Sequence, residues 1–197
     1  MARHEFGHLP FEAEISQHIN FAKENRITVL CDNVLLQTTI PQGKIVEQDT
    51  DDGKKIVQQY TFDFFNYAGI HRSVHLFTTP HDISIKGIIV NSHVTDERHG
   101  LVDFKINLSE NITNKYHVKV SIYDRNGSNV GEVLANEELR GEILIKNANL
   151  WWPFLMHPEP GYLYTIEVKL IDQKEQLEVD VYRMKFGIRS LKWNSTS

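Results

Sequence analysis

The carboxylates of this chain are the side chains best suited to chemistry, and two places stand out by their neighbours. Asp63 lies within a run of aromatic residues, while Glu137 and Glu138 are adjacent in a polar stretch. A carboxylate offers two acceptor oxygens and forms strong charge-assisted hydrogen bonds. On the residues alone, Asp63 is interpreted as a capping or salt-bridging residue, with Arg72 as a candidate partner. Glu137 and Glu138 are interpreted as a solvated charge cluster in a turn.

The histidines and the single cysteine predict neither a metal site nor a nucleophile. His71 and His75 are four residues apart, which on a strand separates them by about 13 Å and is too far for one ion. We therefore predict no metal site. Cys31 ends the apolar run 27–31 and is predicted to be a small buried side chain on a strand. With one cysteine, the chain can form no internal disulfide.

Two adjacent tryptophans, Trp151 and Trp152, precede Pro153. Paired aromatics could form a platform on which a sugar stacks, but they more often pack in a core or between domains. We favour an interface role and keep sugar stacking as the alternative.

Composition narrows the function classes. Among the 197 residues, 41% are hydrophobic and 24% charged, with a formal net charge of −5, which is typical of a soluble globular protein. The chain has no basic stripe, so we expect no nucleic-acid partner. No apolar run approaches the roughly 20 residues that span a bilayer, so we expect no membrane partner. The N-terminus has no apolar run of the kind found in a signal peptide.

Four Asn-x-Ser/Thr sequons are candidate glycosylation sites, and they fit a lysosomal or secreted protein. They lie at Asn107, Asn111, Asn126 and Asn194.

The second half of the chain alternates apolar and polar residues, which is typical of half-buried antiparallel strands. Turn-forming clusters separate the strands, and about seven short strands over some 100 residues predict an immunoglobulin-like sandwich over 81–187. The predicted core positions are Ile83, Ile85, Ile88 and Val90 with a break near Gly87; Val102, Phe104, Ile106 and Leu108; Val118, Val120 and Ile122; Ile143 and Ile145; Tyr164, Ile166, Val168 and Leu170; and Leu177, Val179 and Val181.

Residues 1–80 are predicted to form a separate unit with less regular strands at 27–31, 56–64 and 74–79. A polar insert over 48–55 is expected to be a loop, and the stretch 9–23 allows one short helical turn. Pro80 places the boundary, because proline ends a strand. The whole chain is therefore predicted to be all-β.

Several segments, in order, resemble the β-glucuronidases of glycoside hydrolase family 2. Residues 9–15 (LPFEAEI) resemble a segment of that family's sugar-binding jelly-roll domain, and 66–72 (NYAGIHR) are similar to its NYAGIxR signature. Residues 150–153 (LWWP) and 160–164 (PGYLY) resemble its immunoglobulin-like domain. Residues 186–190 (FGIRS) resemble the segment that leads into its catalytic barrel. No single match is specific, but the ordered set is.

The resemblance implies a partial jelly-roll sandwich over 1–80, followed by the immunoglobulin-like sandwich over 81–187 and the start of a linker over 188–197. The family's jelly roll has strands before the 9–15 segment, so Met1 is expected to be an internal methionine or an artificial start. Both catalytic glutamates of the family lie on its barrel, one within an Asn-Glu-Pro run that this chain lacks. Retaining glycosidases need two carboxyl groups about 5–5.5 Å apart, so we expect no catalytic residue here.

For the parent protein, the resemblance implies hydrolysis of β-D-glucuronides, including those derived from glycosaminoglycans, with retention and without a cofactor. It also implies that Asp63 contacts the sugar, that the chain's own barrel domain is a partner, and that the protein is a homo-oligomer, a tetramer in the family. We expect a lysosomal or secreted parent. The chain is thus predicted to be the non-catalytic N-terminal portion of such an enzyme. The alternative is a stand-alone carbohydrate-binding or protein-interaction β-sandwich module.

Overall fold

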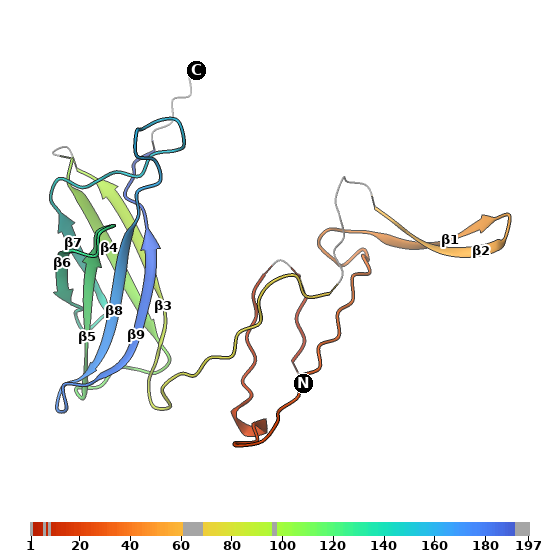
Figure 1. Ribbon diagram of the computed structural model, residues 1–197, viewed down its shortest axis with the longest axis horizontal. Helices are drawn as coiled ribbons and strands as arrows, with labels where there is room; N and C mark the ends of the chain where they lie inside the picture. The colour runs from red at the N-terminus through yellow and green to blue at the C-terminus, as the bar shows by residue number, and fades with distance from the viewer. Residues whose placement is uncertain (1, 6, 8, 61–68, 96–97, 192–197) are drawn as a thin grey trace. The chain divides into compact units, whose positions relative to one another are not determined.

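A computed structural model describes residues 2–5, 7, 9–60, 69–95 and 98–191 of the chain. The chain divides into two compact units, Met1–Leu76 and Phe77–Ser197 (Figure 1). Regular structure among the described residues is almost entirely β, which confirms the predicted all-β class. No helix in this part of the chain is long and apolar enough to cross a membrane.

The first unit contains a hairpin and a short helical turn. Strands β1 (Lys44–Thr50) and β2 (Gly53–Gln59) pair antiparallel, and a turn of the 3₁₀ helix η1 (Ser16–His18) falls within the stretch where a helical turn was expected. The prediction of a loop over 48–55 was wrong, because these residues form the closed end of the hairpin. Gly53 adopts a φ of 107°, which a side chain disfavours and which lets the two strands connect through a tight turn.

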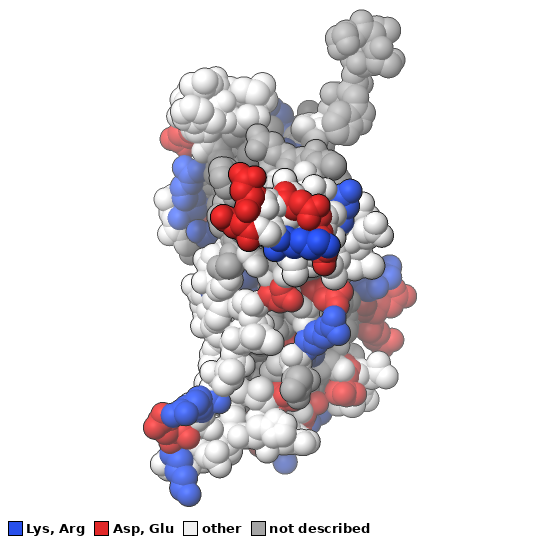
Figure 2. Space-filling view, turned by 90° about the vertical axis from the view of Figure 1, so that its right-hand side faces the viewer, with Lys and Arg blue, Asp and Glu red and all other residues white. Residues whose placement is uncertain are grey.

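Ion pairs lie along this hairpin. Lys54 Nζ lies 3.2 Å from Glu47 Oε2, and Lys55 Nζ lies 3.7 Å from Asp52 Oδ2. Figure 2 likewise shows acidic and basic side chains side by side on the face that it draws. Exposed pairs of this kind contribute little to stability, so the hairpin has weak internal support.

Two predicted strands of the first unit are absent from the described structure. Segments 27–31 and 74–79 are not in a sheet, and Cys31 is exposed rather than buried. The expected strand over 56–64 begins earlier, as β2, which ends at Gln59, and positions 61–64 lie outside the described residues. Among the described residues of this unit, Leu35 is the one buried hydrophobic side chain. Segments 27–31 and 74–79 therefore join no sheet among the residues that the structure describes.

The second unit is a two-sheet sandwich (Figure 1). One sheet has the order β3-β4-β7, with β3 (Ile85–Val94), β4 (Gly100–Leu108) and β7 (Arg140–Ile145). The other has the order β6-β5-β8-β9, with β5 (Tyr116–Tyr123), β6 (Asn129–Leu134), β8 (Tyr164–Asp172) and β9 (Glu178–Phe186). The chain crosses between sheets after β4, β6 and β7, as in immunoglobulin-like folds.

The core lies between these two sheets and follows the predicted alternation. Most of its buried side chains come from every second residue of β4, β5, β7 and β8, and all members of the cluster lie between Ile83 and Ile188. Val102, Val120 and Ile166 are completely buried. A single-residue slip of any of these strands would turn its apolar face outward, so the burial pattern fixes the register.

Register shifts of the kind that β-bulges make modify three edge strands, β3, β6 and β9. The predicted break near Gly87 is confirmed as a register shift between Ile85 and Gly87. The prediction that Leu177, Val179 and Val181 are core positions on one face was wrong for Leu177 and Val181, whereas Val179 packs against the core. A register shift in β9 places Asp180 opposite the core residue Leu170, while Leu177 precedes the strand and is exposed.

Asp180, at the bulge, links the two sheets through a hydrogen bond. Its Oδ2 accepts a hydrogen bond of 2.7 Å from the backbone N–H of Ile85, at the edge of the opposite sheet. A carboxylate in this position satisfies a backbone donor that the edge strand β3 would otherwise leave without a strand partner.

The turn between β8 and β9 yields a pH-dependent prediction. Asp172 Oδ1 accepts hydrogen bonds from the backbone N–H groups of Lys174 and Glu175, and Oδ2 lies 3.6 Å from Lys115 Nζ. The hydrogen bond from Glu175 is the main cause that lowers the pKa of Asp172 below its ordinary value. A lowered pKa means that the folded state prefers the ionised form, so this stabilisation is full above about pH 4 and is lost as the pH falls through the folded-state pKa.

We expect Asp172→Asn to lower the free energy of unfolding at neutral pH, and the difference from the wild type to shrink below about pH 4. Urea titrations at a series of pH values, followed by tryptophan fluorescence, measure this difference, since all three tryptophans lie in the second unit. A difference that stays constant down to acidic pH would contradict the assignment.

Candidate functional site

The residue that the sequence singled out most strongly for substrate contact, Asp63, lies outside the described residues, as does the sequon at Asn194. Asn107, Asn111 and Asn126 are exposed. Among the described residues, no group of three or more His, Cys, Asp or Glu side chains could hold a metal ion. The site described below is therefore built from the second unit, at the end of its sandwich and on the outer face of its four-stranded sheet.

The two tryptophans lie in the loop between β7 and β8, and Trp151 is fastened to the end of the last strand. Its backbone N–H donates to the carbonyl of Ile188 at 2.8 Å, and the guanidinium of Arg189 lies 4.8 Å from the centre of its ring. A Cβ atom at Gly187 would lie 2.9 Å from Trp151 Cβ, so only glycine fits this approach. The structure thus brings together two segments, LWWP and GIRS, that are far apart in the sequence.

Trp152 contacts two later residues of the same loop. Its ring stacks on that of His157, with 6.0 Å between the ring centres and 9° between the planes. Its carbonyl accepts a 2.9 Å hydrogen bond from the N–H of Gly161. Both tryptophans are half-buried, and their rings contact His157 and Arg189. This geometry suits packing better than an open stacking platform, and the domain-interface role stays a prediction.

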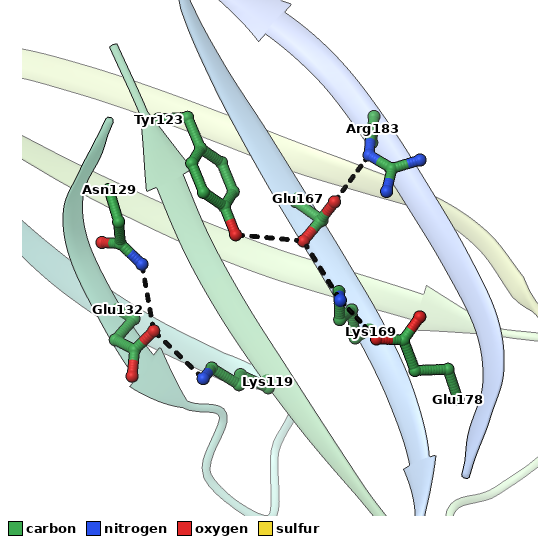
Figure 3. Close-up of polar contacts among 8 residues, drawn as sticks. All are labelled: Lys119, Tyr123, Asn129, Glu132, Glu167, Lys169, Glu178 and Arg183. Carbon is green, nitrogen blue, oxygen red and sulfur yellow. Dashed lines mark hydrogen bonds and ion pairs between the residues drawn. The ribbon is translucent and has the colours of Figure 1, made fainter. Parts of the chain in front are cut away.

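A polar network covers the outer face of the four-stranded sheet (Figure 3). At its centre Glu167 accepts hydrogen bonds from Arg183 Nε at 2.6 Å and from the hydroxyl of Tyr123 at 3.3 Å. Lys169 Nζ lies 3.6 Å from Glu167 and also binds Glu178. The hydrogen bond to Glu178 is the main cause that raises the pKa of Lys169. The Glu167 side chain is only 7% exposed, because these long neighbours cover it.

A second pair lies on the neighbouring strands β5 and β6. Glu132 is held by Lys119 Nζ at 3.0 Å and by Asn129 Nδ2 at 3.0 Å. The contact with Lys119 is the main cause that lowers the pKa of Glu132. A general acid in a glycosidase needs a raised pKa, so Glu132 has the opposite property and serves as a charge partner.

A hollow of about 540 Å³ lies beside this network and is lined by residues that include Asp124, Arg125, Glu167, Arg183 and Lys185. Its two carboxylates are already engaged. Asp124 Oδ1 accepts from the N–H groups of Asn126 and Ser128 in the turn that follows β5, and Glu167 binds Arg183. The hollow thus contains charged side chains but, among its described residues, no pair of carboxylates arranged for acid–base catalysis.

Glu167 is expected to contribute more to stability than the carboxylates around it. Glu167→Gln keeps the shape of the side chain but removes its charge, and hydrogen bonds to charged groups are worth about 1.5–3 kcal/mol. We expect a loss of this order in the free energy of unfolding, measured by urea denaturation with tryptophan fluorescence. The matched variant Glu132→Gln, at an exposed position, should lose less. Equal losses at the two positions would show that burial of Glu167 has no energetic consequence.

Comparison with known proteins identifies the family of this chain. The profile described as Glycosyl hydrolases family 2 matches residues 83–189. The β-glucuronidase of Felis catus is 40% identical over 197 residues, with 97% of this chain and 29% of that protein covered. The human β-glucuronidase is 39% identical over 197 residues, with 95% and 29% covered. The chain therefore spans less than a third of the length of these relatives.

Solved structures of β-glucuronidases are also similar to this chain. The β-D-glucuronidase of Dictyoglomus thermophilum superposes with a TM-score of 0.73 at 32% identity, covering 93% of this chain and 29% of that one. A β-glucuronidase from Ruminococcus gnavus in complex with D-glucuronic acid gives a TM-score of 0.60 at 28% identity, covering 82% and 25%. The chain belongs to glycosyl hydrolase family 2, within which it matches the N-terminal portion of β-glucuronidases.

Proposed function

We propose that this chain is the non-catalytic scaffold of a β-glucuronidase, which completes a sugar site and carries a catalytic domain. The observation that supports this most is the extent of the similarity: 97% of the chain aligns with a β-glucuronidase at 40% identity, and the fold superposes with a TM-score of 0.73. Similarity that crosses both units favours one parent protein over a module that has been separated and reused.

In this proposal the parent enzyme hydrolyses β-D-glucuronides, including those derived from glycosaminoglycans, with retention. Retention requires two carboxyl groups in a defined pair, and the carboxylates of Asp124, Glu132 and Glu167 in the sandwich are engaged in structural contacts. The pair is therefore supplied by the catalytic domain of the parent. Asp63 contributes a sugar contact, since a carboxylate can accept hydrogen bonds from hydroxyl groups. The complex of the Ruminococcus gnavus relative with D-glucuronic acid supports the choice of ligand.

The cellular setting is part of the same proposal. A lysosomal or secreted parent fits the mammalian relatives, and the exposed sequons at Asn107, Asn111 and Asn126 could carry glycans there. We also propose that the parent forms a homo-oligomer. Mass spectrometry of the protein secreted from animal cells, before and after enzymatic removal of N-glycans, tests the glycan assignment.

The direct test of the function compares the chain with a chimaera in which residues 2–191 replace the matching stretch of the feline β-glucuronidase. We expect the chain alone to show no turnover of a chromogenic β-glucuronide from acidic to neutral pH, and the chimaera to show turnover. Activity of the chain that survives repurification, and is lost when one of its own residues is substituted, would falsify the scaffold role. A folded but inactive chimaera would favour a separate binding module instead.

A further inference from the structure

The loop between β7 and β8 exposes three consecutive apolar side chains. Phe154, Leu155 and Met156 are 80%, 86% and 64% exposed, in a unit whose other large apolar residues mostly pack in the core. We call these three residues the apolar tip. Single exposed apolar residues are ordinary, but a contiguous group on one protrusion is typical of an interaction surface.

The apolar tip is held in shape by its own loop. The N–H of Met156 donates to the carbonyl of Pro153 at 3.2 Å, and the stacked rings of Trp152 and His157 flank the tip. Leu155 adopts a φ of 68°, a left-handed conformation that a leucine keeps only when its surroundings impose it. A backbone already fixed in this way loses little of its conformational entropy on binding.

The base of the apolar tip lies where the chain leaves the sandwich. Trp151 lies three residues before Phe154. Its backbone N–H donates to the carbonyl of Ile188, and its ring contacts the guanidinium of Arg189, just after β9 ends. Figure 1 shows this loop at the end of the sandwich toward which β9 runs. Anything that follows residue 191 in a longer chain continues from the segment that holds Trp151, three residues before the apolar tip. The relatives are more than three times as long as their match to this chain.

We propose that the apolar tip packs into an apolar groove of the domain that follows residue 191 in proteins of β-glucuronidase length. This inference rests on the proposed function. The tip acts as a wedge that fixes the angle between the sandwich and that domain, and the contact between Trp151 and Arg189 fixes the angle of the connecting segment.

The size of the apolar tip favours this occupant over a second copy of the chain. A stable interface between separate proteins buries about 800 Å² per partner. A large aromatic side chain buries about 150–250 Å², so three side chains fall short of that area. A domain on the same chain needs less contact, because the covalent link gives it a high effective concentration.

Hydroxyl-radical footprinting tests the proposal, because Phe154 and Met156 are themselves reactive to oxidation. We expect both residues to be oxidised readily in the chain alone and to be protected severalfold in the chimaera. Leu177, which is 59% exposed in the turn at the other end of β8, should be equally reactive in both proteins. Leu155→Asp should lower the melting temperature of the chimaera and leave that of the chain alone unchanged, and Leu177→Asp should change neither.

The outcomes separate this proposal from the proposed function. An active chimaera with a fully reactive tip overturns the wedge and leaves the function standing. A protected tip in an inactive chimaera supports the wedge and counts against the function. Protection that appears in the chain alone and grows with protein concentration assigns the tip to a second copy and overturns the wedge. Should the chimaera not fold, footprinting of the aligned loop in the intact feline relative decides, since an accessible loop there also overturns it.

Discussion

Residues 77–197 expressed alone should unfold in one cooperative transition, and residues 1–76 expressed alone should show none. The reason is the distribution of the core, since all members of the buried hydrophobic cluster lie between Ile83 and Ile188. Among the described residues of the first unit, only Leu35 is a buried hydrophobic. Burying one such side chain contributes about 1.5–3 kcal/mol, whereas fixing a backbone costs about 1–2 kcal/mol for every residue ordered.

Urea titration followed by circular dichroism measures both fragments, and hydrogen exchange reports whether any amide of residues 1–76 is protected. A fragment 1–76 that is soluble and unfolds as a two-state system would contradict the prediction. As a control, the segment that precedes the matched stretch in the feline relative should be fused before residue 1. We expect this fusion to restore cooperative unfolding, because it supplies strands to which segments such as 27–31 and 74–79 can pair.

The sandwich could be predicted from the sequence because its signal is local. Alternation of apolar residues, as in Tyr164, Ile166, Val168 and Leu170, fixes which side chains face the core wherever strands are straight. β6 was missed because Gly131 holds one of its core-facing positions. A Cβ there would lie 2.5 Å from Ile143 Cγ2, so a glycine marks close packing between the sheets rather than a break in the strand.

The prediction failed where the structure depends on distant residues. The bulge in β9 is set by its pairing with β8 and by the hydrogen bond that Asp180 accepts from the N–H of Ile85. Neither can be seen in the alternation of residues 176–181. In the first unit, apolar runs were assigned to strands on composition alone. A strand also needs partners, and sequence composition does not say whether partners are present.

In the candidate site too, the sequence identifies some residues but not the contacts between them. Trp151 and Trp152 could be picked out by residue type, but their contact with the segment after β9 could not be inferred, because it joins residues almost 40 positions apart. Glu167 was overlooked because an acidic residue on a strand's outer face is expected to be solvated. Its burial arises from Tyr123 and Arg183 on the two neighbouring strands, and only the register of the sheet places them there.

Asp63→Ala in the chimaera should lower kcat/KM roughly tenfold to a few hundredfold while leaving the melting temperature unchanged. Under the proposed function, Asp63 accepts hydrogen bonds from sugar hydroxyls, and these strengthen as the ring distorts toward an oxocarbenium-like transition state. A hydrogen bond to a charged group contributes about 1.5–3 kcal/mol, and each 1.36 kcal/mol is about one decade in rate. These two free energies set the expected loss in kcat/KM.

A scaffold role for Asp63 predicts the reverse pattern, with early melting and normal turnover per folded molecule, so both quantities must be measured on the same sample. Asp52→Ala provides the matched control, because the Asp52 side chain is 85% exposed at the closed end of the β1–β2 hairpin. Asp63→Asn adds a second comparison, since an amide oxygen still accepts a hydrogen bond but carries no charge. We expect Asn to recover part of the lost activity, because its oxygen still reaches the hydroxyl that Ala leaves without an acceptor.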